Sequence, residues 1–172
     1  MKTLNWRHTD WNARNFVFSI GQEIVGQLTF NNSWNFNAVY TDKETNLKFS
    51  QKSFWDNDVV ITRDGKFVGE IKHDFFFGRQ TLKLATGVTF KLSSNFWGRN
   101  VYWQNETGEA IIKYQQATMS SMGKGLISLS NSLTIETEEL LISSGLFARQ
   151  MMQKRIALTV VFAVPILAAS NG

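Results

Sequence analysis

Few residues of this 172-residue sequence have types and spacing that could do chemistry. The histidines are His8 and His73, and His73 precedes Asp74 where a strand is expected to end. Neighbouring residues on a strand point to opposite faces, so no catalytic dyad is expected and both histidines are predicted at the surface. Asp56 and Asp58 could touch a cation, but no EF-hand spacing follows them, which favours a solvated loop.

Residue types exclude several further kinds of site. The absence of cysteine excludes disulfides, thiolate zinc sites and thiol catalysis. Residues 122–125 contain a Gly-Lys pair without the upstream glycine or the following Ser/Thr of a phosphate-binding loop, so a turn is expected. No G-x-S-x-G elbow occurs. The sequence therefore predicts no enzyme, no cofactor and no metal site.

Lysines provide the best candidate for a binding surface. In residues 65–72 and 81–92 they alternate with apolar or small residues, so an inward apolar set would turn them onto one outer wall. The inward set is Phe67, Gly69, Ile71, Leu82, Leu84, Phe90 and Leu92, and the outward lysines are Lys66, Lys72, Lys83 and Lys91. Each basic side chain near an anionic membrane contributes about 1 kcal/mol. The alternative is that these lysines only keep a sheet surface soluble and its edges unpaired.

Composition predicts one globular domain with a modest preference for anionic partners. Hydrophobic residues make up 43% of the chain and charged residues 19%, which excludes a disordered chain. The net charge is +4, and residues 59–115 hold eight basic against five acidic side chains. The N-terminus has no apolar signal-peptide core. A cytoplasmic location is expected, either free or peripheral at the inner face of a membrane.

The elements that must position these residues are mostly strands. Gly65–Ile71 resembles Gly108–Tyr114, 43 residues later, and Gly21–Leu28, 44 residues earlier with one extra residue. Each follows an apolar run, and Asp64-Gly65 is a two-residue hairpin signal. Three units of four strands are predicted, at residues 16–20, 21–28, 34–40, 47–49, 59–62, 65–71, 81–85, 88–92, 101–103, 108–114, 126–130 and 133–136.

Twelve short antiparallel strands without proline favour a closed barrel, since closure removes exposed edges. Such a barrel is wider than side chains alone can fill, so its lumen needs a plug. Residues 137–153 form the predicted plug helix, with Thr137 as its cap and no charge from Leu140 to Ala148. The alternative is a β-sandwich with this helix lying over one open end.

The segment Ile156–Ala169 contains no charged residue. Its large side chains alternate with smaller ones, which is typical of a strand as much as of a helix. At fourteen residues it is shorter than the roughly twenty of a membrane span. Two interpretations stay open, a segment packed on the domain and a membrane-inserting tail led by Lys154 and Arg155. The predicted organisation is a barrel domain at residues 1–153 and an apolar tail at 154–172.

The hairpin Val59–Ile71 and the apolar helix from Glu138 resemble the tubby C-terminal-like superfamily, and within it the LURP-one-related proteins and phospholipid scramblases. The resemblance covers roughly residues 10–153 and implies a helix threading the barrel. It also implies roles such as phosphoinositide binding or lipid movement. The sequence lacks the cysteine-rich, proline-rich and acidic stretches associated with scramblases, so no functional residue carries over.

The predicted function is a non-enzymatic domain that binds anionic phospholipid or a membrane surface. The alternative is a structural or protein-interaction module without a small ligand. Six tryptophans lie along the chain, but strands accommodate aromatic residues well and no RNA-binding motif occurs, so nucleic acid is not an expected partner.

Overall fold

The computed structural model describes residues 2–31, 36–53, 58–74, 79–95, 100–117, 123–130 and 133–169, and for residues 155–169 the backbone alone. The described residues form twelve strands and one helix. They are β1 (Lys2–His8), β2 (Asn15–Ile20), β3 (Glu23–Phe30), β4 (Ala38–Thr41), β5 (Asn46–Gln51), β6 (Val59–Arg63), β7 (Lys66–His73), β8 (Gln80–Leu84), β9 (Thr89–Ser94), β10 (Asn100–Gln104), β11 (Ala110–Gln116), β12 (Lys124–Leu129) and α1 (Ile135–Ala169).

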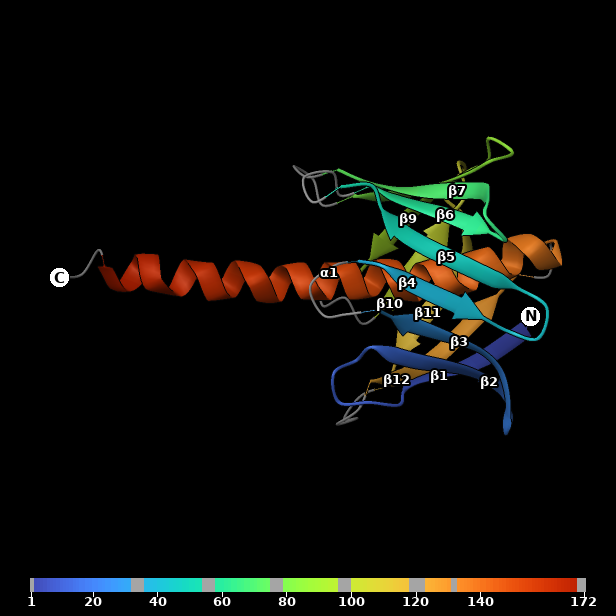
Figure 1. The fold of residues 1–172 in the computed structure, drawn as a ribbon, viewed down its shortest axis with the longest axis horizontal. Coiled ribbons are helices and arrows are strands. Elements are labelled where there is room, and N and C mark those ends of the chain that lie inside the picture. Colours follow the sequence, from blue (N-terminus) through green and yellow to red (C-terminus); the bar gives the residue numbers. More distant parts are fainter. Residues whose placement is uncertain are drawn as a thin grey trace.

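The strands close into an antiparallel barrel around α1 (Figure 1). Each strand pairs with its neighbours in the chain, and β1 closes the ring by pairing with β12 from Lys2–Leu129 to Arg7–Lys124. The predicted twelve-stranded barrel with an apolar helix through its lumen is confirmed. The β-sandwich alternative is wrong, because no sheet edge remains open between β1 and β12.

One of the twelve strands was predicted in the wrong place. Residues 133–136 do not form a strand, and β1 takes that place in the barrel. In β1, Leu4 and Trp6 are buried, while their neighbours Thr3, Asn5 and Arg7 are exposed. This is the period-two pattern of a half-buried strand. Residues 133–136 share that alternation, but they contain the start of α1.

The cap of the helix lies three residues earlier than predicted, because Thr134 caps α1 instead of Thr137. The Thr134 carbonyl accepts the first helical bond from the Glu138 amide at 2.9 Å. Its hydroxyl oxygen accepts from the Thr137 amide at 3.4 Å. Glu136 and Glu138 in the first turn suit the positive end of the helix dipole.

Inside the barrel, α1 is buried at every residue from Leu140 to Met151. The ring of Phe147 stacks between those of Phe30 and Phe49, with centroid separations of 5.4 and 4.6 Å. Gly145 lies so close to Tyr114 that an added Cβ would sit 2.1 Å from the tyrosine Cζ. These contacts fix how far α1 is inserted along the barrel axis.

The internal repeat appears in the structure as three matching β-bulges. The bulged residues are Val25 in the β2–β3 pair, Val68 in β6–β7 and Ile111 in β10–β11, each 43 residues from the next. A bulge adds one residue to one strand and so reverses the facing of the residues before it. For this reason Phe67, predicted to face inward, is 52% exposed.

The barrel has two different ends, which we call the starting mouth and the exit mouth. The starting mouth is where α1 begins, and the short connections such as Gly21–Gln22 and Asp64–Gly65 lie there. The exit mouth is where α1 leaves the barrel, beside the connection from β1 to β2. The backbone of α1 continues beyond it as a helix to Ala169, so residues 156–164 are not a strand. Among the described side chains, no helix is both long and apolar enough to cross a bilayer.

Candidate functional site

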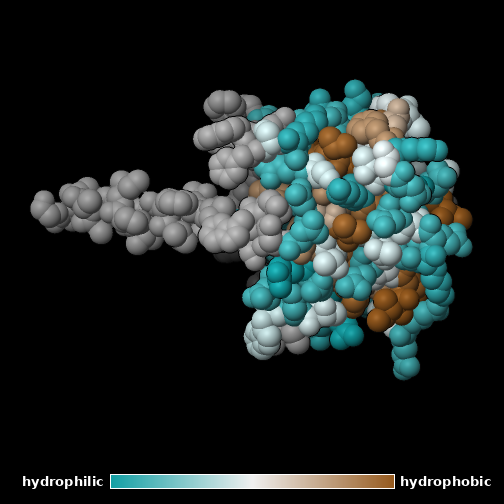
Figure 2. Space-filling view, viewed as in Figure 1, coloured by the Kyte–Doolittle hydropathy of each residue, from teal (hydrophilic) through white to brown (hydrophobic). Residues whose placement is uncertain are grey.

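The predicted wall lysines face outward but do not form one patch. Lys72, Thr81 and Lys91 are neighbours across β7, β8 and β9, and Lys83 lies opposite Glu70. All four lysines are exposed. Lys66 starts β7 at the starting mouth, whereas Lys72 lies six residues away, roughly 20 Å along a strand. Figure 2 shows the visible outer wall as mostly hydrophilic, with separate apolar groups.

Glu70 partly neutralises this wall. Its carboxylate accepts from Lys52 at 3.1 Å and Lys72 at 3.3 Å. Burial pushes the pKa of Glu70 upward, but the bonds from Lys52 and Lys72 outweigh it and hold the pKa below the ordinary value. The wall therefore carries a weaker positive field than the sequence alone predicts.

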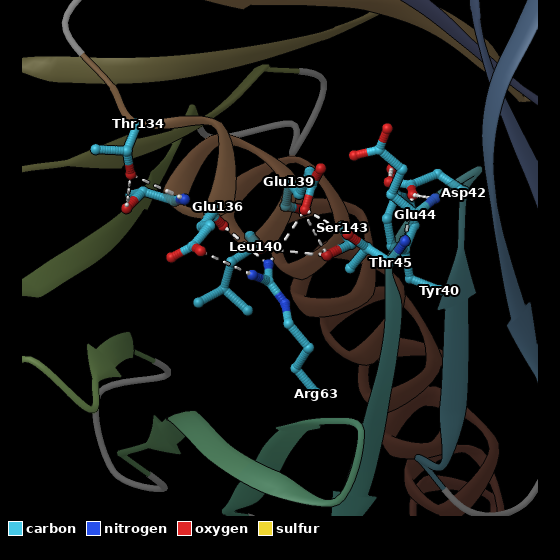
Figure 3. A network of polar contacts seen from close by, with 11 residues as sticks. Tyr40, Asp42, Glu44, Thr45, Arg63, Thr134, Glu136, Glu139, Leu140 and Ser143 are labelled. Carbon is cyan, nitrogen blue, oxygen red and sulfur yellow. Dashed lines mark hydrogen bonds and ion pairs between the residues drawn. The ribbon is translucent and has the colours of Figure 1, made fainter.

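The starting mouth is closed by paired charges (Figure 3). The guanidinium of Arg63 donates to the Glu139 carboxylate at 3.1 Å and to the Glu136 carbonyl at 3.3 Å. The Thr45 hydroxyl donates to the same Glu139 carboxylate at 2.8 Å, and Lys2 pairs with Glu138. These contacts tie the first turns of α1 to β1, β6 and the connection from β4 to β5.

A second structural group lies beside this network. The Tyr40 hydroxyl donates to Asp42 at 3.0 Å, and burial, together with the Asp42 charge, raises the pKa of Tyr40 well above its ordinary value. Asp42 also accepts from the amides of Glu44 and Thr45, which is typical of a capped turn. These hydrogen bonds stabilise the starting mouth.

At the exit mouth, Arg149 is a buried cation held without a carboxylate. Its side chain is 2% exposed, its guanidinium lies over the Trp6 ring at 5.1 Å, and it donates to the Gln116 side chain. Among the described residues no ion pair includes Arg149, and its Nε lacks a hydrogen-bond partner. Burial lowers the pKa of Arg149 to about 10.

Lys154 lies one turn further along α1, between aromatic faces. Its ammonium is 4.8 Å from the Phe30 ring centroid and 5.7 Å from that of Phe36. Burial, and then the nearby charge of Arg14, lower the pKa of Lys154. Cation–π contacts partly replace a counter-ion here.

His8 completes this cluster and is half-buried, so its predicted surface position is wrong. Its ring meets Phe16 edge-on at 4.3 Å. Burial lowers the pKa of His8, the positive charge of Arg149 lowers it further, and Asp10 opposes both. The histidine therefore favours its neutral form beside the buried cation Arg149.

The two mouths carry opposite charge among the described side chains. At the starting mouth nine carboxylates face five cations: Glu23, Asp42, Glu44, Asp64, Glu106, Glu109, Glu136, Glu138 and Glu139 against Lys2, Lys43, Arg63, Lys66 and Lys83. At the exit mouth four carboxylates face eight cations: Asp10, Asp58, Glu70 and Asp74 against Arg7, Arg14, Lys52, Lys72, Arg79, Lys124, Arg149 and Lys154. Arg7 and Lys124 are exposed and directly opposite each other on β1 and β12, an arrangement that costs stability in a sheet.

The described residues contain no cluster of metal-binding side chains. No three His, Asp or Glu side chains within them lie close enough together to hold a metal ion. His73 is half-buried, and its amide donates to Asp58 at 3.2 Å. Two hollows at the starting mouth, of about 490 and 180 Å³, are lined by residues 86–89 with 105–107, and by Val25 with residues 42–44 and Glu139.

Some predicted positions lie outside the described residues. These are Trp34, Trp55, Trp97, Asp56 and Met122. Lys124 and Gly125, predicted as part of a turn, belong to β12.

In comparisons with known proteins, no family model, no curated protein and no solved structure matches this chain.

The charge of the exit mouth was missed from the sequence because its members come from distant segments. Arg7, Arg14, Lys124 and Arg149 meet only after the barrel closes. One signal was available, since Arg149 directly follows the uncharged run Leu140–Ala148 on a helix predicted to be enclosed. An arginine at that place predicts a buried cation.

Proposed function

We propose that this chain is a non-enzymatic domain that binds an anionic phospholipid surface. The supporting observation is the separation of charge along the barrel axis, with eight cations against four carboxylates among the described side chains of the exit mouth. Each cation near an anionic bilayer contributes about 1 kcal/mol, and carboxylates on the same face would cancel it. A barrel with this asymmetry approaches such a surface with its exit mouth first.

The proposal includes a peripheral location at the inner face of a membrane, where anionic lipids are concentrated. The resemblance to the tubby-like superfamily points to the same class of ligand. The lysines Lys66, Lys72, Lys83 and Lys91 form a second candidate surface. Since Lys66 and Lys83 lie near the starting mouth and Lys72 is paired with Glu70, we expect this wall to contribute less.

Sedimentation with vesicles tests the proposal and separates the two surfaces. The protein is incubated with vesicles of phosphatidylcholine alone or with added phosphatidylserine, at two salt concentrations. We expect pelleting on the anionic vesicles that weakens with salt. Arg7→Glu with Lys124→Glu should lower the affinity by roughly 30-fold or more, because two contributions of about 1 kcal/mol are lost.

Two matched variants carry the same change in charge at other places. Lys66→Glu with Lys83→Glu tests the part of the wall nearest the starting mouth, and Lys72→Glu with Lys91→Glu tests the rest. The first of these should bind as the unmodified protein does. Equal pelleting on neutral lipid, unaffected by any of the three charge reversals, contradicts the proposal.

A protein-interaction module is the second candidate, favoured by exposed apolar side chains at the starting mouth. Ile24 and Phe67 are 56% and 52% exposed at equivalent bulged hairpins, and Ile135 is 75% exposed. This alternative predicts no vesicle binding and a partner of defined stoichiometry that is lost with Ile24→Ser and Phe67→Ser together.

A further inference from the structure

Helix α1 does not end where the barrel ends. Burial continues to Met151, but the helical backbone runs on to Ala169 (Figure 1). At 1.5 Å per residue, the part after Met151 is about 27 Å long. The barrel cannot draw this part inward, because Gly145 against Tyr114 and Phe147 between Phe30 and Phe49 fix the axial position.

The projecting part of α1 beyond Arg155 is uncharged in sequence. Ile156–Ala169 contains no charged residue, and a helix uncharged on every side requires an apolar surrounding. Among the side chains that the structure describes, the barrel gives that surrounding to Leu140–Met151. Fourteen helical residues span about 21 Å, compared with about 30 Å for the hydrocarbon core of a bilayer. The segment is therefore long enough to enter a bilayer and too short to cross it.

The groups at the base of this segment match the interface of a bilayer. Trp11 is 84% exposed on the connection from β1 to β2. That connection is attached to α1, because the Gln150 side chain donates to the Ala13 carbonyl at 3.1 Å. Tryptophan is enriched where hydrocarbon meets headgroups. Arg149 and Lys154 flank Gln150 on α1, and among the described residues neither has a carboxylate partner.

We infer that residues 156–169 of α1 insert into the acyl layer of an anionic bilayer on which the exit mouth docks end-on. The inference rests on the proposed function and adds which part enters the lipid and in what orientation. A bilayer encloses an uncharged helix from all sides without a complementary groove. It also presents phosphates to Arg14 and Lys154, and the carboxylate nearest to Arg14 is Asp10, at 4.0 Å.

The absence of cysteine makes a direct test practical, because one introduced thiol carries one fluorophore. Val161→Cys places an environment-sensitive nitrobenzoxadiazole label on the projecting helix, and Val88→Cys places it on an exposed connection at the starting mouth. On phosphatidylserine-containing vesicles, the label at 161 should brighten several-fold and be quenched by lipids brominated on their acyl chains. The label at 88 should not change.

A charge placed in the same segment gives a second readout. Val161→Asp should weaken vesicle affinity by about 100-fold, since an acidic side chain is strongly disfavoured in hydrocarbon, whereas Val88→Asp should have no effect. Val88 is 48% exposed and position 161 lies ten residues beyond Met151 on α1, and circular dichroism checks that the barrel is intact. If the protein pellets but the label at 161 stays dark, or the label at 88 responds instead, the inference is wrong while the proposed function stands. If the protein does not pellet at all, both are wrong.

Discussion

The two mouths of the barrel differ in how the charged residues of α1 are paired. At the starting mouth, Glu138 and Glu139 of α1 are paired with Lys2 and Arg63. At the exit mouth, the buried cation Arg149 of the same helix faces the Trp6 ring and an amide side chain. One end of α1 is locked by ion pairs, and the other keeps cations without carboxylate partners among the described residues.

This difference suggests that the two ends of α1 have different roles. Buried charge without a partner costs stability, so a fold selected for stability alone would pair it or replace it. Groups kept at such a cost are expected where function needs them. The starting mouth anchors α1, and in the proposed function the cations of the exit mouth bind an anionic surface outside the protein.

The largest predicted effect concerns Gly145, whose contact with Tyr114 holds both mouths at their positions along α1. Gly145→Ala places a Cβ 2.1 Å from the tyrosine Cζ. Because the barrel encloses both residues, the overpacking should cost about 3 kcal/mol of unfolding free energy, measured by urea denaturation. Ser144→Ala, at the adjacent buried residue, is the control and should cost about 1 kcal/mol or less. Equal stability of the two variants would mean that α1 sits at another depth.

Smaller effects on the unfolding free energy, expected to differ between the two mouths, compare them directly. Glu139→Gln removes the carboxylate that binds Arg63 and Thr45, and should cost about 1–3 kcal/mol. Arg149→Met fills a similar volume without a buried charge, and should change the unfolding free energy by less than about 1 kcal/mol or increase it. The same Arg149→Met variant should bind anionic vesicles more weakly. If Arg149→Met lowers the unfolding free energy more than Glu139→Gln does, and vesicle binding stays unchanged, the proposed difference between the two mouths is wrong.

Much of the fold could be predicted from local sequence signals. Asp64-Gly65 marks a hairpin with positive φ at both residues, and the uncharged run Leu140–Ala148 predicts an enclosed helix. Two local signals misled. Residues 133–136 alternate like a strand although Thr134 caps the helix, and β1 shows its alternation at only two buried positions, Leu4 and Trp6.

The bulges and the candidate site were harder to predict because they depend on pairing between strands. The extra residue at Val68 turns Phe67 outward, and nothing in the spacing of that single strand shows it. The lysines were correctly predicted to face outward. That Glu70 lies among them, and that Lys66 and Lys72 lie far apart along the barrel, depends on the register of β7, β8 and β9. The charge of the exit mouth requires closure of the whole barrel.

The most direct test of the account is hydrogen–deuterium exchange on anionic vesicles, read separately at the two mouths. We predict slower exchange in the connection at residues 9–14 and in α1 beyond residue 152, with no change in the turns at residues 21–22, 42–45 and 105–109. Protection of those turns, or of the outer wall of β7–β9, with no change at the exit mouth would contradict end-on docking.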